Sequence, residues 1–385
     1  MRQKWSDLSK TDQESIINRI IDNNEDSDPI AIQYNLKPSS LSRTMRRIKA
    51  RRNMQAANEL RIHVGDKLET DSYYVGKDTV GISMSNSPFM TLTPITSISR
   101  ITPYNKKDLE IAISGDTESG SNPNDRTMFI NSNKVLKILM FTDTHFPFHD
   151  SRAIDCFLRA AELLPHDIII NGGDTLDIYG LSKYGKDPSL AFSKNLKQEC
   201  RDWRAFATKL NAISPDSEKF NIFGNHMERY ITWLHNNQSV MHMDEMQIDS
   251  LMKLDQLAWH INVGEILING NYLDLDFPNP ELIIHHGTNA RKNAGSSSRT
   301  ESENLGYVSS ITGHVHRLSV SYKRTLSGQV IMAEGGTLRD LHPDYLHRPD
   351  WQNGFLYITH VPGVATYCQP ILIHNGQAFY EGKLI

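Results

Sequence analysis

Five short segments of this 385-residue chain combine carboxylate, imidazole and amide side chains, which bind divalent cations through oxygen and nitrogen. Of its 16 histidines, all but His63 lie after residue 134. The three cysteines are too far apart to form a CxxC clip, so any metal would be held without thiolate. In chain order, the five segments are Asp143-Thr-His145, Gly173-Asp174, Gly224-Asn225-His226, His285-His286-Gly287 and Gly313-His314-Val-His316.

Each of these segments follows a short apolar run, at residues 136–141, 168–170, 220–223, 282–284 and 308–311. Continuous apolar runs bounded by turns are typical of strands that are buried on both faces, with helices between them. In such α/β sheets, ligands gather beyond the carboxyl ends of the strands. The sequence therefore predicts an α/β fold in which the five polar segments meet at one site.

In this order, the five segments resemble the calcineurin-like metallophosphoesterase family, over about residues 135–340. The resemblance implies a two-sheet αββα sandwich with a two-metal centre at the strand ends. One metal would be held by Asp143, His145 and His316, and the other by Asn225, His286 and His314. The Asp174 carboxylate would bridge both metals, and His226 would contact the phosphate and protonate the leaving oxygen.

The residue types suit this chemistry. Two divalent cations about 3.5–4 Å apart can activate water and clamp both the attacking and the leaving oxygen of a displacement at phosphorus. A bridging ligand needs two oxygens, which a carboxylate such as Asp174 provides. Ligands of nitrogen and oxygen suit Mn, Fe, Zn, Ni or Mg, and we expect two divalent ions, with Mn first. His285 remains an alternative to His286 as the ligand.

The residue after His226 departs from the family pattern. The family usually has Glu or Asp there, which helps to orient the histidine, whereas this chain has Met227 followed by Glu228. Either Glu228 or Asp143 could supply the missing acceptor. Without one, His226 would be a weaker acid than its counterparts.

The chain before these motifs divides by composition into three parts. Residues 1–57 are expected to form a basic, helix-turn-helix-like helical domain, because helical periodicity is followed by a tight turn and an arginine-rich stripe. Residues 58–104 alternate as in strands and predict a small β-rich module or connector. Residues 105–134 are rich in Gly, Ser, Asn and Asp and predict a linker or long loop, so the metallophosphoesterase domain would span 135–385.

Charge is distributed unevenly along the chain. Residues 37–61 carry eight Lys or Arg against one acid, whereas the part after residue 134 is acidic. A basic helix could contact DNA or RNA through Arg43, Arg46, Arg47 and Arg51, or it could only pack on a neighbouring domain with a solvated charged face. Between two predicted ligands, Arg291, Lys292 and Arg299 could contact substrate phosphates or belong to a solvated loop.

These features predict a hydrolase that cleaves phosphodiester bonds, with nucleic acid, most simply DNA, as substrate or docking partner. Two alternatives remain open. The protein could act on small phosphate esters or cyclic nucleotides and use its N-terminal region for assembly, or it could bind nucleic acid with vestigial chemistry. The sequence is also compatible with a homo-oligomer. No apolar run is long enough to span a membrane, and no secretory signal is legible, so we expect a cytoplasmic protein without a membrane partner.

Overall fold

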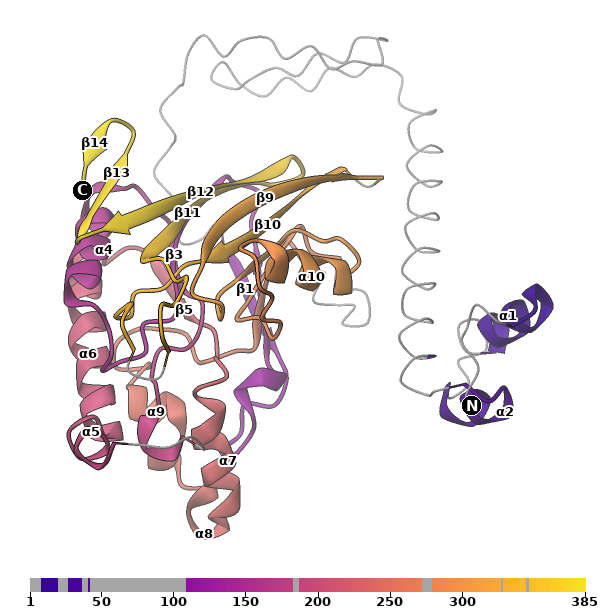
Figure 1. Cartoon of the computed structure of the whole chain (residues 1–385), viewed down its shortest axis with the longest axis horizontal. Coiled ribbons are helices and arrows are strands. Elements are labelled where there is room, and N and C mark those ends of the chain that lie inside the picture. The colour runs from indigo at the N-terminus through magenta and orange to yellow at the C-terminus, as the bar shows by residue number, and fades with distance from the viewer. Residues whose placement is uncertain are drawn as a thin grey trace. The chain divides into compact units, whose positions relative to one another are not determined.

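The computed structural model describes residues 8–19, 27–36, 41, 109–182, 187–271, 279–326, 328–343 and 346–385 (Figure 1). By its internal contacts the chain divides into two units, Met1–Pro103 and Tyr104–Ile385. Among the helices in the described part, none is both long and apolar enough to cross a bilayer.

The larger unit contains two seven-stranded sheets. The first has the order β1-β2-β6-β7-β8-β10-β9. Its strands are β1 (Glu110–Ser114), β2 (Thr127–Asn131), β6 (Glu265–Ile268), β7 (Leu282–His285), β8 (Ser310–Thr312), β9 (Leu318–Thr325) and β10 (Gly328–Gly335). β7, β8 and β10 are parallel neighbours, whereas β9 and β10 form an antiparallel pair, so the sheet is mixed.

The second sheet has the order β14-β13-β12-β11-β3-β4-β5. Its strands are β3 (Leu136–Phe141), β4 (Ile168–Asn171), β5 (Glu218–Asn221), β11 (Gly354–Val361), β12 (Ala365–His374), β13 (Gln377–Tyr380) and β14 (Lys383–Leu384). β3, β4 and β5 are parallel, and β11 pairs antiparallel to β3. The predicted α/β class with two sheets is confirmed, and each of the five predicted apolar runs overlaps a strand.

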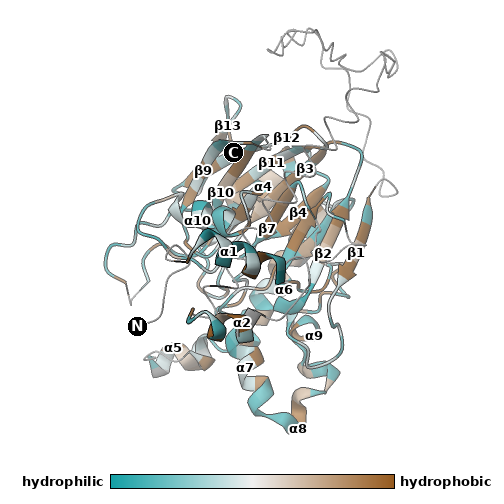
Figure 2. Cartoon of the chain, turned by 90° about the vertical axis from the view of Figure 1, so that its right-hand side faces the viewer, coloured by the Kyte–Doolittle hydropathy of each residue, from teal (hydrophilic) through white to brown (hydrophobic). Residues whose placement is uncertain are grey.

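Alternation along β3 explains the two apolar layers. Ile138 and Met140 belong to a cluster shared with the first sheet, whereas Leu139 and Phe141 belong to the cluster that packs beneath helices. Figure 2 shows the hydrophobic colour running along β3, β4 and β7, as expected of strands that are covered on both faces. The parallel strands are therefore buried in the apolar interior, and their carboxyl ends lie at the same edge of the sheet.

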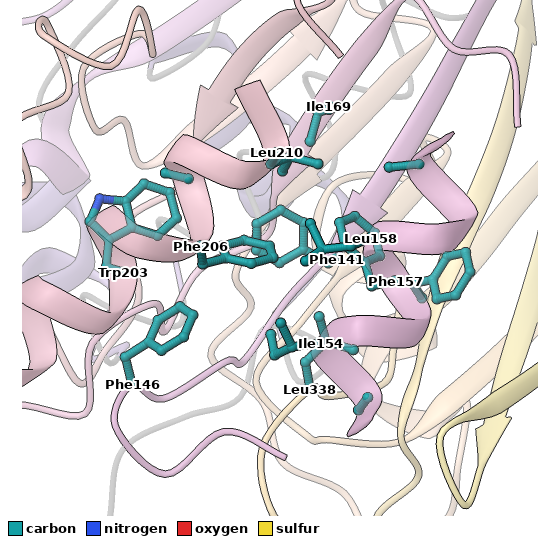
Figure 3. Close-up of a cluster of buried hydrophobic side chains, with 14 of the residues drawn as sticks. Phe141, Phe146, Ile154, Phe157, Leu158, Ile169, Trp203, Phe206, Leu210 and Leu338 are labelled. Atoms are coloured by element: carbon teal, nitrogen blue, oxygen red, sulfur yellow. The ribbon is translucent and has the colours of Figure 1, made fainter. Parts of the chain in front are cut away.

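Two long helices cover the outer face of the second sheet. They are α4 (Ser151–Leu163) and α6 (Leu196–Ile213), and they begin at Asp150 and Asn195, whose side chains accept backbone N–H bonds in the first turn. Their apolar faces meet Phe141 in the aromatic cluster of Figure 3. The other helices of this unit are η4 (Pro123–Asp125), η5 (Tyr179–Leu181), α5 (Pro188–Ser193), α7 (Glu228–Asn236), α8 (Gln238–Met241), η6 (Asp244–Met246), α9 (Ile248–Met252) and α10 (Ser296–Asn304).

The predicted linker at 105–134 is wrong. This stretch contributes β1 and β2, which pair with each other, and β2 also pairs in parallel with β6. The polar turn between the two strands is anchored by Arg126, whose Nη1 lies 3.0 Å from Asp249 Oδ2. The run Met128-Phe-Ile130 is buried, although its Gly-, Ser- and Asn-rich surroundings resemble a loop in the sequence. The sheet therefore begins before residue 135.

In the N-terminal unit, the structure describes two helices, α1 (Lys10–Ile17) and α2 (Ser27–Gln33). The Ser9 side chain caps α1 by accepting from Asp12 N at 3.1 Å. A small apolar cluster includes Ile16, Ile30 and Leu41. The remainder of the predicted basic helix, with Arg43, Arg46, Arg47 and Arg51, and the predicted β-rich module at 58–104 lie outside the described residues.

Candidate metal centre

The predicted site residues stand on the loops that leave β3, β4, β5, β7 and β8. Five of them have φ in the left-handed region: Asp143, His145, Asp174, His314 and His316. Few non-glycine residues adopt this conformation, and when they do, it often occurs at functional sites. Here it turns each loop sharply at the end of its strand. Gly224 and Gly313 allow these loops to approach, because a Cβ at either position would collide with the Asp174 or the Asp143 carboxylate.

The first group of ligand atoms comes from the β3 and β8 loops. Asp143 Oδ1 lies 3.1 Å from His316 Nε2 and 3.7 Å from His145 Nε2, and the two ring nitrogens are 3.0 Å apart. All three residues are buried. Among the described residues, no donor makes a well-formed hydrogen bond to Asp143 Oδ1. A buried oxygen converging on two imidazole nitrogens in this way fits the ligand set of a divalent cation.

The second group joins the β4, β5, β7 and β8 loops. Asn225 Oδ1 lies 3.1 Å from His286 Nε2 and 2.8 Å from His314 Nδ1. Asp174 Oδ2 lies 3.2 Å from His286 Nε2 and 3.8 Å from His145 Nε2, so this carboxylate stands between the two groups. The structure thus brings together all seven residues that the sequence analysis named as ligands.

His285 faces away from this set. It is the last residue of β7, where successive side chains point to opposite faces, and its Nε2 lies 3.2 Å from Ser310 Oγ. Burial lowers the pKa of His285 to about 4. His286, one residue later, is the member of the pair that faces the other ligands.

Electrostatics keep the carboxylates ionised in this buried place. Burial raises the pKa of Asp143, but the neighbouring imidazoles of His316 and His145 outweigh it and hold that pKa well below its usual range. The pKa of Asp174 is likewise lowered, against its burial, by His286. Conversely, burial lowers the pKa of His286, but the Asp174 carboxylate overrides this and raises it to about 9. Burial lowers the pKa of His316 to about 4.

His226 lies beside the ligands, and its acceptor is neither of the two residues predicted. His226 Nδ1 lies 3.1 Å from the Asp177 carbonyl oxygen and 3.4 Å from Asp177 Oδ2. Glu228 instead accepts from Asn124 Nδ2 at 2.6 Å. Met227 is fully buried in the cluster beneath the helices, where a carboxylate would be costly. The orienting role expected of Glu228 or Asp143 therefore falls to Asp177.

Asp177 was missed in the sequence analysis, although the string Gly173-Asp-Thr-Leu-Asp177 places a second acid on the same strand-end loop as Asp174. Asp177 Oδ2 also lies 3.1 Å from His145 Nδ1, so one carboxylate contacts both histidines. Burial raises the pKa of Asp177, but hydrogen bonds from His145 and His226 outweigh this and lower it well below the ordinary range. Asp177 therefore remains an acceptor at neutral pH.

Two arginines near Asp177 were also missed. Arg229 donates from Nη1 to the Asp177 carbonyl at 2.9 Å, and its Nη2 lies 3.2 Å from His226 Nε2. Arg339 Nη1 lies 3.7 Å from Asp177 Oδ2, and its guanidinium stands 5.2 Å from the centre of the Trp351 ring. Arg229 follows His226 by only three residues, which is a local signal in the sequence, whereas no spacing links Arg339 to the motifs.

The structure places the predicted phosphate-binding residues Arg291, Lys292 and Arg299 at the surface, with exposed side chains. Their segment is nevertheless held firmly. Arg317, next to His316, donates to the carbonyl oxygens of Lys292 at 2.6 Å and Arg291 at 2.5 Å. These contacts fix the backbone of the loop beside the β8 segment that carries His316. They do not involve the three basic side chains, whose contact with substrate phosphate stays a prediction.

No protein-family model matches the chain, and no curated protein matches it. Solved structures do match. A single mutant of Vps29 from Entamoeba histolytica is 13% identical with a TM-score of 0.29, over 62% of this chain and all of that one. Vps29 from Chaetomium thermophilum is 10% identical with a TM-score of 0.33, over 65% of this chain and 95% of that one.

YfcE, a phosphoesterase from E. coli, is 11% identical with a TM-score of 0.29, over 60% of this chain and 98% of that one. Likenesses at these scores carry no functional argument.

Proposed function

We propose that this protein is a metal-dependent phosphoesterase that hydrolyses phosphodiester bonds, with nucleic acid as its substrate. The observation that carries the proposal is the position of Asp174. Its carboxylate lies between one group of ligand atoms at His145 and another at His286. A carboxylate shared between two sets of nitrogen and oxygen ligands is the arrangement that a two-metal site requires.

The residues fit two divalent cations, with Mn as our first choice. Asp143, His145 and His316 would hold one, Asn225, His286 and His314 the other, and Asp174 would contact both. When bound, such cations supply Lewis acidity and lower the pKa of water. Imidazole, carboxylate and amide ligands without thiolate also suit Fe, Zn, Ni and Mg.

The residues of the chain itself supply orientation and proton transfer. His226 is partly exposed, at 18%, and its Nε2 lies 4.0 Å from Asp174 Oδ2. Its Nδ1 faces the carbonyl and the carboxylate of Asp177, both acceptors, so the ring is held with Nε2 toward the site. Once Nε2 has also taken a proton from solvent, it can give that proton to the leaving oxygen of a phosphodiester in this orientation.

Hydrolysis of bis-p-nitrophenyl phosphate under Mn²⁺ tests the assignment. We expect Asp174→Ala to abolish the release of nitrophenol, because the variant removes the shared carboxylate. The exposed Asp155 on α4 provides the matched control, and Asp155→Ala should keep wild-type activity. Equal activity of Asp174→Ala and wild type would refute the metal assignment.

Nucleic acid is proposed as the substrate because of the basic segment 37–61. We expect duplex binding to weaken with rising salt and to weaken further when Arg43, Arg46 and Arg47 become alanine, since phosphate contacts release counterions. As a control, alanine at Lys197, Arg201 and Lys209 removes three exposed charges from α6. If duplex binding changes neither with salt nor with the alanine substitutions at Arg43, Arg46 and Arg47, the N-terminal helices would have a role in assembly instead.

A substrate panel distinguishes the remaining candidates. Linear, circular and single-stranded DNA, RNA, cyclic dinucleotides and phosphomonoesters would each be incubated with the protein and Mn²⁺. Cleavage of a nucleic acid supports the proposal. Turnover confined to the cyclic dinucleotides or monoesters would replace it with hydrolysis of small phosphate esters.

A further inference from the structure

Arg229 occupies a position from which it can reach a bound phosphate. It lies in the first turn of α7, and its Nη1 is anchored on the Asp177 carbonyl. This anchor directs the other arm of the guanidinium, Nη2, to His226 Nε2 at 3.2 Å. Because His226 Nε2 is itself 4.0 Å from Asp174 Oδ2, Arg229 faces the same space as the ligand set.

The contact between Arg229 and His226 is one that a phosphate can displace. Both groups near His226 Nδ1 are oxygen acceptors, so Nδ1 carries the proton and Nε2 presents a lone pair to the guanidinium. A neutral imidazole is a weaker acceptor than a phosphate oxygen. Charge-assisted hydrogen bonds between arginine and phosphate are roughly twice as strong as neutral ones, and the planar guanidinium can make two at once.

Arg339, the other arginine near Asp177, is not available in this way. Its side chain is only 4% exposed, it faces Asp177 Oδ2, and its guanidinium packs against the rings of Phe148 and Trp351. Both arginines lie 3.7 Å from the Asp177 carboxylate, but Arg339 is enclosed. Arg229 is 19% exposed, so an anionic ligand that enters the site can reach it.

We infer that Arg229 binds the non-bridging oxygens of the scissile phosphate, and that its contact with His226 is the resting arrangement that substrate displaces. In the bound arrangement, Nη1 stays on the Asp177 carbonyl while Nη2 turns to the phosphate. His226 Nε2 is then free to face the leaving oxygen. This inference rests on the proposed function, because it assigns Arg229 to the substrate of the same site.

Binding of inorganic phosphate to the Mn²⁺-loaded protein tests this role without turnover. We expect Arg229→Ala to weaken phosphate binding, measured by titration calorimetry, by tenfold or more. Arg229→Lys should give an intermediate loss, because an ammonium keeps the charge but not the fork. Arg229→Gln keeps a polar donor but removes the charge and the fork, and it should be as weak as Arg229→Ala. Arg201→Ala, which removes an exposed charge from α6, should bind phosphate as wild type does.

Kinetics with bis-p-nitrophenyl phosphate provide the second readout. We expect KM and the inhibition constant of phosphate to rise together in Arg229→Ala, with a smaller fall in kcat. Phosphate binding by Arg229→Ala equal to that of wild type would overturn the inference. Wild-type phosphate binding by Arg229→Gln would overturn it as well, because that result would show that the charge at position 229 is not needed to bind phosphate. If the wild type binds phosphate but hydrolyses nothing, the proposed function fails while the binding comparison still decides the role of Arg229.

Discussion

Replacement of Asp177 by asparagine removes a negative charge from a point where two imidazoles and two guanidiniums meet. The Asp177 carboxylate lies 3.1 Å from His145 Nδ1, 3.4 Å from His226 Nδ1 and 3.7 Å from both Arg229 and Arg339. Asparagine offers one acceptor oxygen, and its amide group would face another donor. The backbone carbonyl of residue 177 still lies 3.1 Å from His226 Nδ1, so the variant disturbs only the second of the two acceptors that orient His226, and it leaves no cavity.

The size of the effect depends on the leaving group. General acid catalysis contributes about 10²–10⁴-fold, and loss of orientation should forfeit at least the lower end of that range. For a dinucleotide, whose leaving oxygen is an alkoxide, we expect kcat to fall about 100-fold, or about 2.7 kcal/mol in barrier. Nitrophenolate leaves without a proton, so bis-p-nitrophenyl phosphate should lose about threefold or less.

The assay compares Asp177→Asn with wild type on both substrates at saturating Mn²⁺. Saturation matters because Asp177 also orients His145, and such supporting contacts typically change metal affinity about 10–100-fold. Asp155→Asn, an exposed change of the same kind, serves as the control. An equal loss on both substrates would refute the reasoning, since it would mean that Asp177 does not act through His226. Unchanged hydrolysis of the dinucleotide would refute it as well.

Further predictions concern the linkage of metal binding to pH and the support of the basic loop. Asp174 raises the pKa of His286 to about 9, so below that pH a cation must displace a proton from His286. Mn²⁺ affinity should therefore increase from pH 7 to 9 and level off above pH 9. Calorimetry in buffers of different ionisation heat should show that Mn²⁺ binding releases protons. A constant affinity between pH 7 and 9 would contradict this prediction. Glu334 is buried and accepts the N–H groups of Gly295, Ser297 and Ser298 at the start of α10. Glu334→Leu should lower the free energy of unfolding by about 1–3 kcal/mol in urea, because it leaves buried donors unpaired. The exposed Glu303→Leu should change it by less than about 0.5 kcal/mol, and equal effects would count against the role of Glu334.

The convergence of the candidate ligands could be predicted from the sequence because each of them closely follows a strand. The run before Asp143 is continuous and apolar, as expected of a strand buried on both faces, and the same holds before Asp174 and His286. Parallel strands align their carboxyl ends, so a local pattern in the chain translates into proximity in space. The same rule separates His286 from His285, but only once the alternation of β7 is fixed by its pairing with β6 and β8.

The contact between His226 and Asp177 could not be predicted in this way, because the two residues follow different strands. His226 follows β5, whereas its acceptor Asp177 follows β4, with the 18-residue helix α6 between them in the chain. No spacing rule connects two residues that meet only because β4 and β5 are parallel neighbours. β1 and β2 were missed for a related reason, because a five-residue strand among polar turns is fixed by its pairing rather than by its own composition.

The position of Asp177 has a consequence for the site as a whole. If an acid stood at position 227, histidine and acceptor would move together on one loop, and their geometry would be local. Met227 is instead buried in the apolar layer, and the acceptor comes from the adjacent strand end. The orientation of His226 therefore depends on how β4 packs beside β5, and so does the anchor of Arg229 on the Asp177 carbonyl. Substitutions that loosen this pair of strands should disturb proton transfer and phosphate binding together, even when every candidate ligand is intact.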